Sequence, residues 1–88
     1  MDINLIKGAI IKAIPDAQIF VANPEEDGQH FQALVVSATF ETLSLIKQHQ
    51  SVMKSLKEQF DSEALHALAL KTFTPAKWDV SKASYNLG

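Results

Sequence analysis

The chain has 88 residues, a formal net charge of −2 and 47% apolar residues, which fits one ordinary globular domain rather than a disordered segment. It contains no cysteine, which excludes disulfides, thiol catalysis and any zinc or iron–sulfur site built from its own thiolates. All of its strong bases are lysine, and the missing arginine together with the acidic balance disfavours tight nucleic-acid binding.

The chain begins with a predicted helix over residues 3–14. Asp2 is a suitable N-cap, and Pro15 disfavours helical geometry at the residue before it. Isoleucine recurs at helical spacing, at Ile3, Ile6, Ile10 and Ile14. This spacing gives the helix one apolar face that must pack against the rest of the domain.

Two predicted strands follow the helix. Residues 16–22 alternate in polarity, and residues 30–37 are rich in Phe, Leu and Val. The segment between them, residues 23–29, is acidic and contains proline and glycine, which is typical of a turn. We therefore expect an antiparallel hairpin.

The second half of the chain is predicted to form one or two helices, a strand and a last helix. A short turn or helix at residues 40–43 leads into one long helix over residues 44–60, and residues 65–73 form a third strand. Thr74 is a natural N-cap and Pro75 suits the first helical position, so a short last helix follows. The apolar stripe of the long helix consists of Leu45, His49, Val52, Met53, Leu56 and Phe60.

This order predicts an α+β domain in which a three-stranded sheet has its helices packed on one face. We expect the domain to span residues 1–80 and the tail, residues 81–88, to be loosely ordered, because the tail shows no clear period. No apolar run approaches the roughly 20 residues that a transmembrane helix needs, and no signal peptide is recognised. We therefore expect a cytoplasmic protein, or one inside an organelle.

The chain carries no pattern typical of an enzyme. Glu25, Glu26 and Asp27 are adjacent in a predicted loop, where carboxylates are usually just solvated. The serines lack a G-x-S-x-G context, and there is no Walker loop, dinucleotide fingerprint or H-E-x-x-H motif. We expect a non-enzymatic protein.

Three histidines remain as candidates for chemistry. His49 falls on the stripe of the long helix and is best explained as a packed or partly exposed residue. His30 opens the second strand, where a polar strand-edge role and a functional role fit about equally. His66 opens the third strand, where a structural role is more common.

Two of these histidines can converge on a metal. If the third strand pairs beside the first or second, His66 lies near the end of the loop at His30. Two imidazoles alone make a weak, open site, but imidazole replaces cysteine on one iron of Rieske-type [2Fe–2S] clusters. With thiolates from a partner, the chain could supply half of a cluster site.

The chain contains, in this order, the segments His30–Ser37, Phe40, Ser44–Val52, Leu56 and His66–Trp78. Together these segments closely resemble the BolA family. The resemblance covers residues 2–79, and it implies a class II KH-like fold, αββααβα, without the Gly-x-x-Gly loop that clamps nucleic acid in KH domains. That fold agrees with the element order predicted above.

The resemblance also implies a partner and a cofactor. BolA-like proteins bind monothiol glutaredoxins, and the pair can share a glutathione-ligated [2Fe–2S] cluster, which the isolated chain is not expected to bind. His66, in His66-Ala67-Leu68, is carried over as the metal ligand of the BolA side. Relatives take a second ligand, cysteine or histidine, from the hairpin loop, but residues 23–29 contain neither. His30 is therefore the provisional second metal ligand, and Asp27 lies close to where some relatives place cysteine.

A DNA-binding transcription regulator is the alternative, because some BolA proteins are described in that role. Many relatives carry arginines around the position of His49, where this chain has Lys47, Gln48 and Gln50. Together with the negative net charge, this departure disfavours DNA binding. A third interpretation is a metal-free interaction domain that forms a homodimer when alone.

Overall fold

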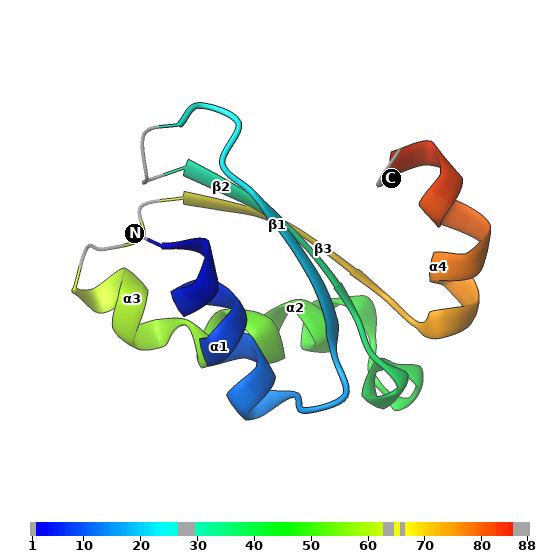
Figure 1. Cartoon of the computed structure of the whole chain (residues 1–88). Helices are drawn as coiled ribbons and strands as arrows, with labels where there is room; N and C mark the ends of the chain where they lie inside the picture. Colours follow the sequence, from blue (N-terminus) through cyan, green and yellow to red (C-terminus); the bar gives the residue numbers. More distant parts are fainter. Residues whose placement is uncertain (1, 27–29, 63–64, 66, 86–88) are drawn as a thin grey trace.

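The fold is an αββααβα arrangement around a three-stranded sheet, as the computed structural model shows (Figure 1). The structure describes residues 2–26, 30–62, 65 and 67–85. The elements are α1 (Ile3–Ala13), β1 (Gln18–Ala22), β2 (His30–Val36), the 3-10 helix η1 (Ala38–Thr42), α2 (Leu45–Ser55), α3 (Lys57–Asp61), β3 (Ala67–Phe73), α4 (Pro75–Ser81) and the 3-10 helix η2 (Lys82–Tyr85). The predicted order of helices and strands is confirmed.

The sheet has the order β1-β2-β3. β1 and β2 form the predicted antiparallel hairpin, in which Gln18 lies opposite Val36. β3 pairs with β2 in parallel, so His30 lies beside Ala67 at one end and Val36 beside Phe73 at the other. A parallel pair requires a crossover connection, and the segment containing η1, α2 and α3 supplies it.

One face of the sheet, the core face, packs against α1, α2 and α3. Phe31 and Val35 of β2 point to this face because strand side chains alternate, and both are buried. α1 begins at the predicted cap, where the Asp2 carboxylate accepts a hydrogen bond from the Asn4 N–H at 2.9 Å. The completely buried centre of the cluster consists of Ile6, Ile10, Val35, Val52 and Leu56.

The opposite face of the sheet, the open face, is covered at one end by α4. The prediction that all helices pack on one face therefore holds for α1, α2 and α3 but not for α4 (Figure 1). The Trp78 ring lies 5.4 Å from the Phe20 ring and 5.2 Å from the Phe73 ring, measured between centroids. Phe20 and Phe73 alternate with core-face residues, so the chain needs a second apolar cover.

The single helix predicted over residues 44–60 is wrong, because two helices occupy that segment. They are separated at Leu56, whose backbone has φ −105° and ψ 12°. The Leu56 N–H bonds to the Met53 carbonyl at 3.1 Å, which tightens the last turn of α2. Helical spacing resumes afterwards, and Phe60 packs against the core. An apolar repeat alone does not reveal such a break.

The inward face of α2 also differs from the predicted stripe. Leu45 is 62% exposed and Met53 37% exposed, whereas the polar Gln48 is only 7% exposed. The prediction failed because a hydrophobic pattern places an amide outside, whereas a fully hydrogen-bonded amide can be buried.

The end of the described chain lies against α4. Tyr85 of η2 packs on Trp78 and Phe73, with ring centroids 5.7 and 5.8 Å apart. The tail that was expected to be loosely ordered therefore contains a 3-10 helix over Lys82–Tyr85, and residues 86–88 lie outside the described residues. No helix within the described ranges is long and apolar enough to span a bilayer.

Candidate functional site

His30 is the first residue of β2 and belongs to the open face. Its neighbour Phe31 points to the core, so alternation places the imidazole on the other side. The His30 side chain is about half exposed, at 49%. Its Nδ1 atom lies 3.3 Å from a carboxylate oxygen of Glu25, in the loop after β1.

The loop after β1 brings Glu25 to His30 through a turn. The Glu26 N–H bonds to the Asn23 carbonyl at 3.0 Å, with Pro24 at the second position of the turn, which proline favours. Glu26 itself has φ 54°, in the left-handed region. Sequence reasoning had assigned Glu25 only to solvent, although the Asn-Pro turn before it was a usable signal.

The Glu25 carboxylate can orient the His30 ring. Both side chains are exposed, so the pair contributes little to stability. A carboxylate on Nδ1 favours the tautomer in which Nε2 carries the lone pair that a metal takes. A carboxylate in this position is found behind many histidine ligands of metals. It would suit the His30 ring to bind a metal through Nε2.

The start of β3 lies directly beside His30. His30 and Ala67 are register partners in the parallel pair, so both strands begin at the same end of the sheet. The prediction that His66 lies near His30 required the third strand to pair beside the first or second. The structure has this pairing. His66 precedes Ala67 in the chain, and both His66 and Asp27 lie outside the described residues.

The donor set at this end of the sheet is small. The chain has no thiol, and among the described residues no three His, Asp or Glu side chains are grouped so as to hold a metal ion. An oriented imidazole on an open rim fits a [2Fe–2S] cluster only if another molecule supplies the remaining ligands.

His49 lies elsewhere, on α2. It is partly buried and borders a surface hollow together with Leu45, Ile46, Gln50 and Met53. This agrees with the prediction of a packed or partly exposed helix residue.

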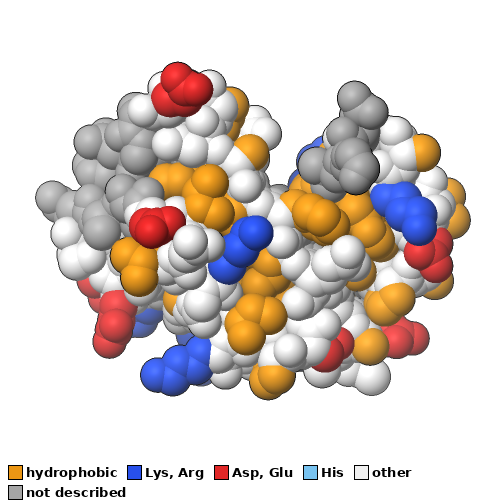
Figure 2. Space-filling model, viewed as in Figure 1, with side chains coloured by type: hydrophobic (Ala, Val, Ile, Leu, Met, Phe, Trp, Pro, Cys, Tyr) orange, Lys and Arg blue, Asp and Glu red, His pale blue; other side chains and the backbone are white. Residues whose placement is uncertain are grey.

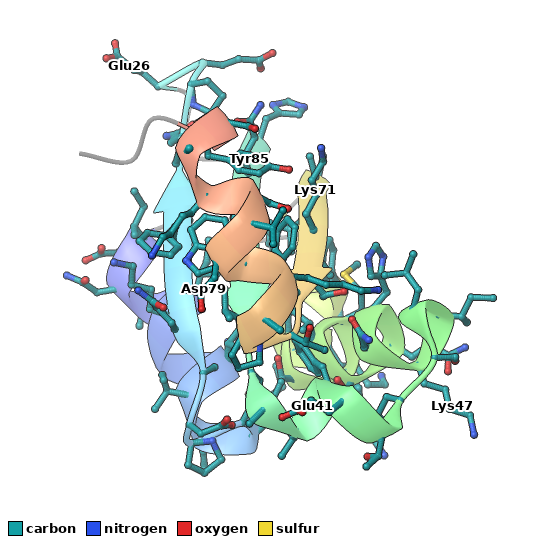
Figure 3. All side chains as sticks on the ribbon, turned by 90° about the vertical axis from the view of Figure 1, so that its right-hand side faces the viewer. Glu26, Glu41, Lys47, Lys71, Asp79 and Tyr85 are labelled. Atoms are coloured by element: carbon teal, nitrogen blue, oxygen red, sulfur yellow. The ribbon has the colours of Figure 1, made fainter. Side chains whose placement is uncertain are left out.

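The residues around His49 offer little to DNA. Gln48 is buried, and its Nε2 donates to the carbonyls of Phe40 at 3.2 Å and Leu43 at 3.0 Å. Its Oε1 accepts from the Thr72 hydroxyl at 2.8 Å. Lys47 is exposed and points outward from α2 (Figure 3). Of the three positions Lys47, Gln48 and Gln50, Gln48 is therefore unavailable to a nucleic acid, and Lys47 is the only one that carries a positive charge.

A second feature that sequence reasoning missed is a groove on the open face. It lies between the strands and Tyr85, and Lys71 of β3 is at its edge. The alternation of Ala69 and Lys71 with inward residues was visible in the sequence. The position of η2 over the sheet was not.

Comparison with known proteins identifies relatives over most of the chain. A family profile described as BolA-like protein matches residues 13–77. The acid stress protein IbaG of Escherichia coli is 32% identical over 78 residues, which covers 89% of each chain. A protein of Haemophilus influenzae named DNA-binding transcriptional regulator BolA is 39% identical over 49 residues, covering 56% of this chain and 47% of the relative.

A solved structure of a BolA homologue from Coxiella burnetii has the same fold. It superposes with a TM-score of 0.75 at 30% identity, covering 90% of this chain and 97% of the homologue. The profile match spans well over half of the chain, and the fold agrees with it. The chain therefore belongs to the BolA-like protein family.

Proposed function

We propose that this chain is a non-enzymatic adaptor in iron–sulfur cluster assembly, trafficking or iron-status signalling. It forms a complex with a monothiol glutaredoxin, and the two proteins share a glutathione-ligated [2Fe–2S] cluster. His66 is the proposed metal ligand of this chain, and His30 is the provisional second ligand. Membership of the BolA-like family supports this proposal.

The observation that carries the proposal is the pairing of the two strand starts. The parallel register puts His30 beside Ala67, the residue after His66, at an open end of the sheet in a chain without thiols. The Glu25 carboxylate orients the His30 ring. The cluster would supply the redox-active iron, while this chain contributes imidazole donors and a docking surface.

The test is reconstitution of the complex with a monothiol glutaredoxin and glutathione. We expect a heterodimer whose visible absorption and circular dichroism differ from those of the glutaredoxin alone. His66→Ala should change these spectra, His30→Ala should change them less, and His49→Ala is the matched control. An unchanged spectrum in His66→Ala would refute the ligand assignment, and failure to form a heterodimer would refute the partnership.

DNA binding is the second candidate, favoured by the name of the Haemophilus influenzae relative. The net charge of −2, the absence of arginine and the burial of Gln48 weigh against it. Fluorescence anisotropy with a labelled duplex at low salt decides the matter. Binding that weakens steeply with salt would support this function, and no binding at low salt would remove it.

A further inference from the structure

The open face of the sheet is only partly covered. α4 covers the end that contains Phe73, whereas none of the described helices lies over the strand ends nearer His30 (Figure 1). The strand register sets the side chains of this face in rows across the sheet. The two central rows are Ala22–Gln32–Ala69 and Phe20–Leu34–Lys71.

Small side chains make this face concave. Ala22 and Ala69 flank Gln32 in their row, and Tyr85 of η2 forms a wall over the neighbouring row. The resulting groove encloses about 520 Å³. Figure 2 shows a hollow between the sheet and the C-terminal helix, with apolar side chains on both sides. Its volume falls within the roughly 300–1,000 Å³ of small-molecule sites, which are mostly apolar with a few placed polar groups.

One positively charged side chain, that of Lys71, lies at the edge of the groove. The Lys71 Nζ donates a hydrogen bond to the Tyr85 hydroxyl at 3.2 Å and lies 5.4 Å from the centre of that ring (Figure 3). Among the described residues, no carboxylate lies within ion-pair distance of Lys71, whereas Lys57 and Lys82 each pair with an aspartate on their own segment. The groove therefore combines a mostly apolar floor, which also contains the Gln32 amide, with one positive charge that no described acid neutralises.

The geometry points to a binding site for an amphipathic monocarboxylate, a molecule with one carboxylate and an apolar body. The carboxylate accepts hydrogen bonds from the Lys71 Nζ and the Tyr85 hydroxyl. The apolar body lies over Ala22 and Ala69, against the Phe20 ring. One ammonium and one phenol match a singly charged head group, whereas a phosphate dianion usually recruits several cationic or N–H donors.

Decanoate is the test ligand, and the full chain is titrated with it by calorimetry and by the fluorescence of Trp78. This residue is the only tryptophan, and its ring lies 5.7 Å from that of Tyr85, so its emission reports on the groove. We expect saturable binding with a Kd on the order of 10–500 μM, as ligand-efficiency limits allow for a molecule of this size. Absence of saturable binding up to about 5 mM decanoate, ten times the upper end of the expected Kd range, would overturn the proposal.

Matched variants and ligands test the two halves of the site. Lys71→Gln should weaken decanoate binding about tenfold or more, the scale of a charge-assisted hydrogen bond, and Lys47→Gln should leave it unchanged. Decanol, which lacks the charge, should bind the wild type weakly and be insensitive to Lys71→Gln. Equal binding of decanol and decanoate, or equal effects of the two lysine substitutions, would overturn the assignment of the head group.

Filling the hollow tests the position of the apolar body. Ala69→Leu should abolish binding of decanoate while the far-ultraviolet circular dichroism spectrum stays that of the wild type. If this variant does not fold, amide chemical-shift mapping on the wild type replaces it. Shifts on β2 and β3 at Leu34 and Ala69 support the site, and shifts confined to α2 refute it. Binding should persist in His66→Ala, which separates this site from the proposed cluster ligand.

Discussion

Gln48 holds three elements together through one side chain. It lies on α2, donates to the carbonyls of Phe40 within η1 and of Leu43 just after it, and accepts from Thr72 of β3. Gln48 and Thr72 are buried, so their polar side-chain atoms need partners. The amide thus fixes how the crossover segment docks on the last strand.

Replacing Gln48 by leucine should destabilise the domain by about 2–4 kcal/mol, because it leaves the Leu43 carbonyl and the Thr72 hydroxyl without their partner and takes from the Phe40 carbonyl one of its two donors. Thr72→Val should cost about 1–2 kcal/mol, since only the Gln48 oxygen loses its donor. The double variant should cost about 1 kcal/mol less than the sum. Urea unfolding measures all three values, and strict additivity would contradict the hydrogen bond between the two residues.

Asp16 ties the turn before β1 to the start of η1. The hydrogen bond donated by the Ser37 hydroxyl, at 2.7 Å, is the main cause that lowers the pKa of Asp16; burial opposes it, and the Ala38 N–H adds to it. Because the pKa is lower when folded than when unfolded, the ionised form stabilises the fold above the unfolded pKa. That stabilisation is lost as the pH falls through the folded pKa.

The wild type should therefore be more stable than Asp16→Asn near neutral pH, and the difference should shrink as the pH falls below about 4, the usual range of an aspartate. Thermal unfolding between about pH 7 and pH 3 measures the difference. Glu41→Gln, at an exposed position on η1, is the control. A difference that does not depend on pH would disprove the role of the charge.

His30 and its neighbours show what the sequence could not reveal about the candidate site. The pattern indicated His30 as a strand-start histidine, and the structure places it there. Its contact with Glu25 depends on the path of the loop, which alternation and composition do not determine. His66 lies outside the described residues, so its ligand role stays a prediction.

The place of α4 in the chain was predicted correctly, but the face of the sheet that it covers was not. Its start followed from the cap at Thr74 and the proline after it, and the Thr74 hydroxyl accepts from the Lys77 N–H at 3.4 Å. Which face it covers depends on long-range contacts between Trp78 and Phe20, which no local pattern contains. The break between α2 and α3 escaped prediction for the same reason.

Trp78→Ala should destabilise the domain by about 3–5 kcal/mol, because it removes a nearly buried indole from between three aromatic rings. Chemical unfolding followed by far-ultraviolet circular dichroism measures the loss. Val80→Ala on the same helix is the control, since Val80 is 83% exposed and its truncation should change stability by no more than about 0.5 kcal/mol. Similar costs for the two variants would show that α4 does not cover the sheet.

For the whole molecule, the element order and the hairpin followed from the sequence because turns, caps and apolar repeats are local signals. The strand order was open, since it depends on how the crossover segment packs. The absence of cysteine is also a property of the whole chain, and it means that the domain alone has no thiolate with which to hold an iron–sulfur cluster.

Incubated with iron, sulfide and glutathione, the isolated chain should develop no cluster chromophore, because it offers no thiolate. Visible absorption after gel filtration measures this, and a monothiol glutaredoxin treated in the same way is the comparison. A cluster that stays with the isolated chain would show that its own side chains suffice as ligands, contrary to the proposal of a shared site.

The parallel pairing of β2 with β3 has a consequence for the timing of assembly. β1 and β2 meet through a short hairpin, but the end of the sheet that contains His30 is completed only when the last strand docks, after the whole crossover segment has been made and folded. Such distant pairings form late in folding. An unfinished or partly unfolded chain therefore does not present this end of the sheet, and a partner that recognises it selects molecules whose folding is complete.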